Sequence, residues 1–142
     1  MKIVNCESKH LSALKCLSDS LFNDGWTQKQ FQDELENYNA KIFLLENNNQ
    51  IVGFVCLRTN TDEMEILNIG VGKDFQGKGY GKILLQKAIE YAEKKQITQI
   101  FLEVREDNTK ALNLYKTMGF CENRRRKKYY ASCDGLELIK KI

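Results

Sequence analysis

Apolar residues recur along this chain with two periodicities, one typical of helices and one typical of strands. After Ser8, a plausible N-cap, the leucines at positions 11, 14, 17 and 21 form one apolar stripe, which predicts an amphipathic helix that is broken at Asn23-Asp24-Gly25. Thr27 is followed three positions later by Gln30, a capping-box pattern that predicts a second helix from Thr27 to about Asn37. Trp26 and Phe31 flank this start at the spacing of a hydrophobic staple.

Shorter apolar runs predict strands. Three of them, at residues 41–46, 51–58 and 64–71, follow one another across short polar links and predict an antiparallel meander. A brief strand is expected near the N-terminus, beginning at Ile3. Near the C-terminus, residues 120–130 and 136–139 predict a hairpin that turns at Asp134 and Gly135.

The middle of the chain predicts a strand, a helix and a second strand in succession. The helix begins after the glycine-rich residues 77–81, buries an apolar stripe and ends near Lys95. The following strand, residues 97–104, is apolar on both faces, which is typical of a central position. A short helix capped by Asn108 and stopped by Gly119 comes next. Because a crossover helix joins parallel strands, the meander must meet a parallel pair in one mixed sheet.

The composition is that of one globular domain spanning residues 1–142, with 42% hydrophobic and 29% charged residues. The chain holds no apolar run near the roughly 20 residues of a membrane span, and its start lacks the apolar core of a signal peptide. We therefore expect a cytoplasmic protein with no membrane partner.

Metal and nucleophile chemistry have little support in the sequence. The five cysteines are widely spaced, without a C-x-x-C pair, and are predicted to be small core side chains. The one histidine, His10, cannot build a metal cluster by itself and is expected to be an exposed helical residue. We expect no metal cofactor.

The net charge of +3 is too small to indicate nucleic-acid binding, and no direct nucleic-acid partner is expected. Positive charge is concentrated in residues 124–128, which are five consecutive cations. We interpret this run first as a solvated strand or loop. The alternative is an electrostatic site for coenzyme phosphates or for a ribosomal partner.

The chain is most informative where the third strand of the meander ends. Gly77, Gly79 and Gly81 occupy alternate positions at a strand-to-helix turn. Without side chains there, backbone N–H groups can point at an anion, and the helix dipole adds partial positive charge. Lys82 replaces the third glycine of a dinucleotide fingerprint, and Ile83 replaces the Ser or Thr of a P-loop. A phosphorylated ligand of another kind is predicted, with a ligand-free glycine turn as the alternative.

Two side chains farther along could carry chemistry. Glu103 interrupts the apolar strand 97–104, and a carboxylate in such a place needs partners and often lies at a functional site. The alternative is an exposed Glu103 at the strand end, paired with Arg105. Tyr115 follows Asn108 by seven residues, about two helical turns, so both share one side of their helix. A phenol there could donate a proton to a leaving thiolate, or could simply pack among apolar neighbours.

These motifs together resemble the GNAT family of N-acetyltransferases, and in particular its RimI-like branch. The shared residues, in chain order, are Gln76-Gly77-Lys78-Gly79-Tyr80-Gly81, Glu103-Val104-Arg105 with Asn108, and 111–115 followed by Gly119-Phe120. The similarity runs from about Trp26 to Tyr130.

The resemblance implies the GNAT fold, an α/β (α+β) domain with a mixed central sheet of about seven strands, about four helices and splayed central parallel strands. It also implies that acetyl-CoA is the co-substrate. The acceptor would be the N-terminal α-amine of a protein, which in this branch is the alanine of ribosomal protein S18.

The resemblance further implies a role for each site residue. Ile69, Gly70 and Val71 would pair through their backbone with the pantetheine arm, like an added strand. The pyrophosphate would lie in the turn formed by Gln76, Gly77, Lys78, Gly79, Tyr80, Gly81 and Lys82. Asn108 would hold the pantetheine. Glu103 would deprotonate the incoming amine, and Tyr115 would protonate the coenzyme A thiolate.

The implied chemistry agrees with the rest of the sequence. An α-amine, with a pKa of about 8, is mostly protonated at neutral pH and needs a base before it can attack a thioester. Direct attack needs no protein nucleophile, and the sequence offers no convincing one. Two other functions stay open at this point: acetylation of a small amine such as a polyamine or an antibiotic, and a non-catalytic module that binds coenzyme A.

Overall fold

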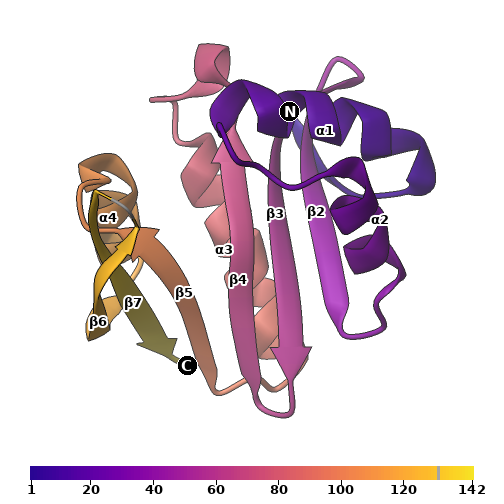
Figure 1. Ribbon diagram of the computed structural model, residues 1–142. Coiled ribbons are helices and arrows are strands. Elements are labelled where there is room, and N and C mark those ends of the chain that lie inside the picture. The colour runs from indigo at the N-terminus through magenta and orange to yellow at the C-terminus, as the bar shows by residue number, and fades with distance from the viewer. Residues whose placement is uncertain (131) are drawn as a thin grey trace.

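The computed structural model describes residues 1–130 and 132–142, and its centre is one mixed sheet (Figure 1). Within these residues the sheet has seven strands in the order β1-β2-β3-β4-β5-β7-β6. Their bounds are β1 Lys2–Asn5, β2 Ala40–Asn47, β3 Gln50–Asn60, β4 Glu63–Val71, β5 Gln99–Arg105, β6 Cys121–Tyr130 and β7 Cys133–Lys141. Only the pair β4 and β5 is parallel, among the strands described. The predicted mixed sheet is confirmed.

Helices cover both faces of this sheet. The described residues form four α-helices, α1 Leu11–Leu21, α2 Gln28–Glu36, α3 Tyr80–Lys94 and α4 Thr109–Thr117, and two 3₁₀ turns, Ser8–His10 and Lys73–Phe75. Figure 1 shows α1 and α2 on one face and α3 on the other. The predicted capping box starts α2, since Thr27 and Gln30 each accept a hydrogen bond from the other's backbone N–H.

Each face of the sheet buries its own apolar core. Under α1 and α2, the ring of Phe31 lies 5.2 Å from that of Trp26 and 6.0 Å from that of Phe54, measured between centroids. This contact confirms the staple predicted for Trp26. On the other face, α3 buries the apolar stripe expected of it, namely Leu84, Leu85, Ala88, Ile89 and Ala92.

The sheet opens at its centre because β4 and β5 separate along their length. The last register pair between them is Ile66 with Leu102. Beyond it, β4 stays paired with β3 as far as Val71, after a bulge that shifts the β3–β4 register next to Cys56. β5 stays paired with β7 as far as Arg105. The carboxyl half of β4 therefore turns a backbone edge toward the gap, as predicted for splayed strands.

Two details of the sheet correct the sequence prediction. β7 begins at Cys133, so Asp134 and Gly135 lie inside the strand and do not form the turn. The Asp134 side chain instead holds β6, since its Oδ1 accepts a hydrogen bond from the backbone N–H of Lys128 at 2.8 Å. The chain between β6 and β7 includes residue 131, which lies outside the described residues. β5 also buries one face only, with Ile100, Leu102 and Val104 inward.

The cysteines divide into two groups. Cys6 and Cys56 are buried, as predicted, whereas Cys16 and Cys121 are exposed and Cys133 is half-buried. The prediction was wrong for the exposed pair because spacing alone does not tell which face of a helix or strand a small residue occupies. None of the helices among the described residues has both the length and the apolar character of a bilayer span.

Phe31→Ala should lower the free energy of unfolding by about 3–5 kcal/mol, because it removes a fully buried ring from between two aromatic neighbours. Urea unfolding followed by circular dichroism measures this change. The matched control is Tyr38→Ala, since Tyr38 is 98% exposed and its loss should cost less than about 0.5 kcal/mol. Equal effects of the two substitutions would contradict the placement of the core.

Candidate functional site

The glycine-rich turn connects β4 to α3, and its glycines serve two purposes. Gly77 and Gly79 have φ angles of +76° and +86°, and the space in which a Cβ would project is open at both. Gly81 instead allows close packing, since a Cβ there would come within 3.3 Å of Leu114 in α4. The turn thus brings backbone N–H groups close to open space at the start of α3.

A cavity of ≈ 500 Å³ lies beside this turn. Every residue that the sequence assigned to cofactor binding lines it except Lys78, and Tyr115 lines it as well. The Lys78 ammonium lies 5.9 Å from the centre of the Phe75 ring. Gln76 has a structural contact too, since its Nε2 donates to the Val71 carbonyl at 2.8 Å and ties the turn to β4.

The cavity suits an elongated anionic ligand. The starts of both α3 and α4 line it, and the first N–H groups of a helix have no partner within the helix. Lys82 and Lys110 add positive charge to the lining. Sequence reasoning missed Lys110, although its place in the first turn after the Asn108 cap is a signal that could have found it.

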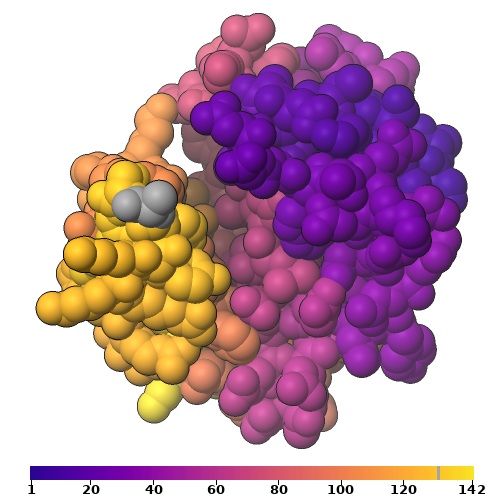
Figure 2. Space-filling model, viewed as in Figure 1, coloured from indigo at the N-terminus to yellow at the C-terminus, as the bar shows by residue number. Residues whose placement is uncertain are grey.

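A second cavity, of ≈ 280 Å³, lies at the gap between β4 and β5. Phe22 at the end of α1 and Tyr130 of β6 both line it, and neither was singled out as a site residue from the sequence. Figure 2 shows the corresponding hollow between α1, in indigo, and the yellow β6. Ile69, Asn108 and Tyr115 line both cavities, so the two meet where the strands part.

Glu103 lines only the second cavity. Its Oε1 lies 3.0 Å from Nε of Arg126, while its Oε2 is buried and has no hydrogen-bond partner among the described residues. The alternative pairing with Arg105 is wrong, because that guanidinium donates to both Asp107 oxygens at 3.0 Å. A buried carboxylate oxygen without a donor is costly to a fold, so this one invites a donor from a ligand.

Tyr115 is both a packing residue and a cavity residue. Its ring centre lies 6.0 Å from that of Phe120, and the side chain is 6% exposed. Burial raises the pKa of Tyr115 to about 12, so the phenol keeps its proton at neutral pH. Tyr115 and Asn108 line the same two cavities, which agrees with the prediction from their spacing that they share one side of their helix. Asn108 caps α4 by accepting the backbone N–H of Ala111 at 3.2 Å.

The cationic run at residues 124–128 lies on the exposed edge strand β6, as its first interpretation predicted. Its three arginines form ion pairs with nearby carboxylates: Arg124 with Glu137, Arg125 with Glu106, Glu122 and Asp134, and Arg126 with Glu103. The run does not contribute to the lining of the cavity beside the glycine turn. The alternative of a site for coenzyme phosphates therefore gains no support.

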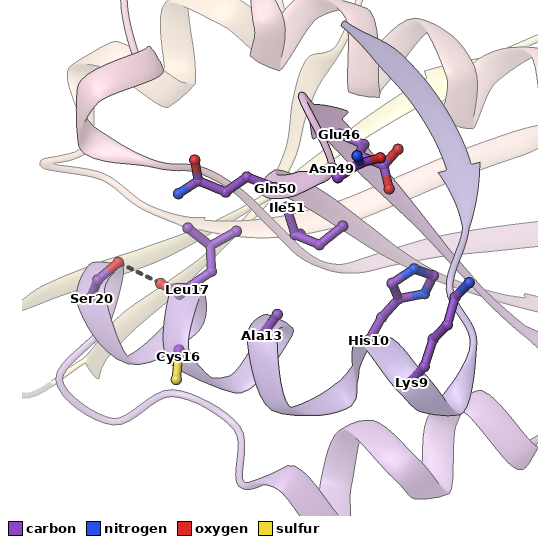
Figure 3. Close-up of a pocket in the computed structure, with 10 residues that line it drawn as sticks. All are labelled: Lys9, His10, Ala13, Cys16, Leu17, Ser20, Glu46, Asn49, Gln50 and Ile51. Carbon is purple, nitrogen blue, oxygen red and sulfur yellow. Dashed lines mark hydrogen bonds between the residues drawn. The ribbon is translucent and has the colours of Figure 1, made fainter.

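A separate cavity of ≈ 750 Å³ lies between α1 and the turn that joins β2 to β3 (Figure 3). Leu17 of α1 and Ile51 of β3 line its middle, and Lys9 and His10 lie at one end. His10 is half-buried and not exposed as predicted, since its Nδ1 accepts the Glu7 backbone N–H at 2.9 Å.

Among the described residues no His, Cys, Asp or Glu cluster could hold a metal ion.

Three comparisons bear on this geometry. The model of the Acetyltransferase (GNAT) family matches residues 11–120. The [Ribosomal protein bS18]-alanine N-acetyltransferase of Escherichia coli (strain K12) is 35% identical over 113 residues, which cover 79% of this chain and 75% of that protein. The Haemophilus influenzae protein of the same name is 43% identical over 88 residues, covering 62% and 60%.

The crystal structure of the ribosomal-protein-S18-alanine N-acetyltransferase from Escherichia coli has the same fold. It superposes with a TM-score of 0.92 at 28% identity and covers 99% of this chain and 93% of that one. The matched residues 11–120 include the glycine turn, Glu103 and Tyr115. With the family model spanning most of its length and the split sheet built as the resemblance implied, the chain belongs to the GNAT family of acetyltransferases.

Proposed function

We propose that the protein transfers the acetyl group of acetyl-CoA to the N-terminal α-amine of a protein, and that its acceptor is the N-terminal alanine of ribosomal protein S18. One observation carries the proposal. Two cavities meet beside Tyr115 where β4 and β5 part, and Glu103 lines only one of them. A donor and an acceptor can therefore approach the same point from different sides.

Acetyl-CoA would occupy the cavity at the glycine turn. The backbone N–H groups of residues 77–82 would hold its pyrophosphate at the start of α3, with Gln76 fixing the turn to β4. The backbone edge of residues 69–71 would pair with the pantetheine arm like an added strand, and the Asn108 amide would hold that arm from α4. A backbone N–H near Val71 would polarise the thioester carbonyl.

Glu103 and Tyr115 would then move the protons. Glu103 accepts one proton from the α-ammonium, and the neutral nitrogen forms a C–N bond with the acetyl carbon. As the C–S bond breaks, Tyr115 donates its phenolic proton to the sulfur. The second proton lost by the nitrogen restores Tyr115 through solvent, and Glu103 releases its proton to water. One proton is released overall for each acetyl group transferred.

The acceptor side favours a peptide over a small amine. The second cavity opens into the hollow between α1 and β6, where an extended chain could continue beyond its first residue (Figure 2). The names of the relatives in Escherichia coli and Haemophilus influenzae point to the same acceptor. A ribosomal-protein acceptor would place the protein in the cytoplasm.

Glu103→Gln should lower kcat/KM for an acceptor peptide by about 100-fold, because the base is lost, while the Kd for acetyl-CoA stays the same. Steady-state kinetics and calorimetry measure the two quantities. Glu137→Gln is the matched control, since Glu137 lies directly across from Glu103 on β7. If the Glu103→Gln variant kept the kcat/KM of the wild-type protein at every pH, the assignment of Glu103 as the base would be ruled out.

Tyr115→Phe should slow kcat by about 100-fold with little change in the KM for the peptide, because only the proton donor to sulfur is lost. The ring and its packing against Phe120 are retained, so the melting temperature should stay close to the wild-type value. A fully active Tyr115→Phe variant would refute its role as the acid.

The acceptor class is tested with an Ala-Arg-Tyr-Phe peptide and with spermidine. The expected kcat/KM is at least about 100-fold higher for the peptide, and mass spectrometry should place the acetyl group on its α-amine. Faster transfer to spermidine would favour the small-amine function instead. Binding of acetyl-CoA without transfer to either acceptor would favour a non-catalytic module.

A further inference from the structure

We propose that Arg126 is a positioning residue that holds Glu103 in its reactive orientation, an inference that rests on the proposed function. Arg126 belongs to the edge strand β6, and Glu103 belongs to β5, with β7 between them. The guanidinium thus reaches across β7, and its Nε lies 3.0 Å from Oε1 of Glu103. One carboxylate oxygen is held by Arg126, and the other, Oε2, is left for the acceptor amine.

The guanidinium of Arg126 is itself supported by an aromatic ring. It lies 5.0 Å from the centre of the Tyr129 ring, which is the distance of a cation–π contact. Gly135, the cross-strand neighbour of Arg126 on β7, gives that ring its room. A Cβ at Gly135 would lie 3.0 Å from Tyr129 Cδ2. Gly135, for which the sequence predicts a turn, therefore lies in a strand and leaves space for the Tyr129 ring.

A bulge in β6 brings Tyr129 back beside Arg126. The β6–β7 register shifts between Arg126 and Tyr130. Within the bulge Lys128 has a φ of +52°, which is unusual for a residue with a side chain, and its N–H is held by Asp134. The strand is thus irregular at the point where it supports the Arg126–Glu103 ion pair.

The charges around Glu103 explain why it needs this cation. Glu137 of β7 lies directly opposite Glu103. Glu65 of β4 lies close enough for the charges of both to act on its carboxyl group. Burial raises the pKa of Glu65, with Glu103 and Glu137 adding to the rise and the cations Arg58 and Arg126 opposing it.

The other charged groups nearby are already engaged. Arg58 is paired with Glu34, Arg105 with Asp107, and Arg124 with Glu137. Tyr130 of β6 also faces Glu103, whose charge adds to the rise that burial causes in the pKa of Tyr130. Arg126 is therefore the cation that keeps Glu103 oriented among carboxylates.

Arg126→Gln should lower kcat/KM for the Ala-Arg-Tyr-Phe peptide about 10-fold, through misorientation of the base. Acetyl-CoA affinity and melting temperature should stay unchanged. Arg124→Gln, which removes a guanidinium two positions away, should leave all of these quantities at the wild-type value.

A double-mutant cycle separates positioning from a structural role. In the Glu103→Gln background, Arg126→Gln should cause no further loss of kcat/KM, because its effect acts through Glu103. Losses that multiply would overturn the inference. Arg126→Lys should recover part of the activity, and it carries the test if Arg126→Gln fails to fold.

The outcomes also distinguish this inference from the proposed function. An active wild-type protein with an equally active Arg126→Gln variant would overturn the inference alone. A wild-type protein that acetylates no peptide would overturn the proposed function and the inference with it.

Discussion

The separation of β4 from β5 is the constraint on which the site depends. Their pairing ends at Ile66 and Leu102, and each strand then follows its other neighbour. An open edge inside a sheet is costly unless something pairs with it. The separate cores on the two faces keep the strands in place, and the starts of α3 and α4 converge on the gap. The two cavities, Glu103 and Tyr115 all lie around this one opening.

The face of the sheet away from α3 gives the site its electrostatic character. Carboxylates from β4, β5 and β7 gather there, and arginines of β6 offset them. Like charges that face each other across strands reduce stability, and a region rich in carboxylates attracts cationic groups. The cavity at the glycine turn has the opposite character, with helix starts and lysines suited to phosphates. The two sides of the opening therefore favour ligands of opposite charge.

The sequence predicted what local chemistry determines. The capping box at Thr27, the apolar stripe of α3 and the glycine turn are all set by residues within a few positions of one another. It did not predict the contacts that depend on strand order. The Arg126–Glu103 pair requires β7 to lie between β5 and β6, and the packing of Tyr129 on Gly135 requires the bulge in β6. Lys78 illustrates a similar limit, since motif position did not reveal that its side chain lies over Phe75.

Two cavities that meet at one point imply that donor and acceptor are bound together when the acetyl group moves. Initial-rate kinetics test this geometry most directly, with acetyl-CoA and the acceptor peptide varied against each other. Direct transfer in a ternary complex predicts double-reciprocal lines that intersect. Parallel lines, together with an acetylated form of the protein isolated in the absence of peptide, would show a covalent intermediate and contradict direct attack.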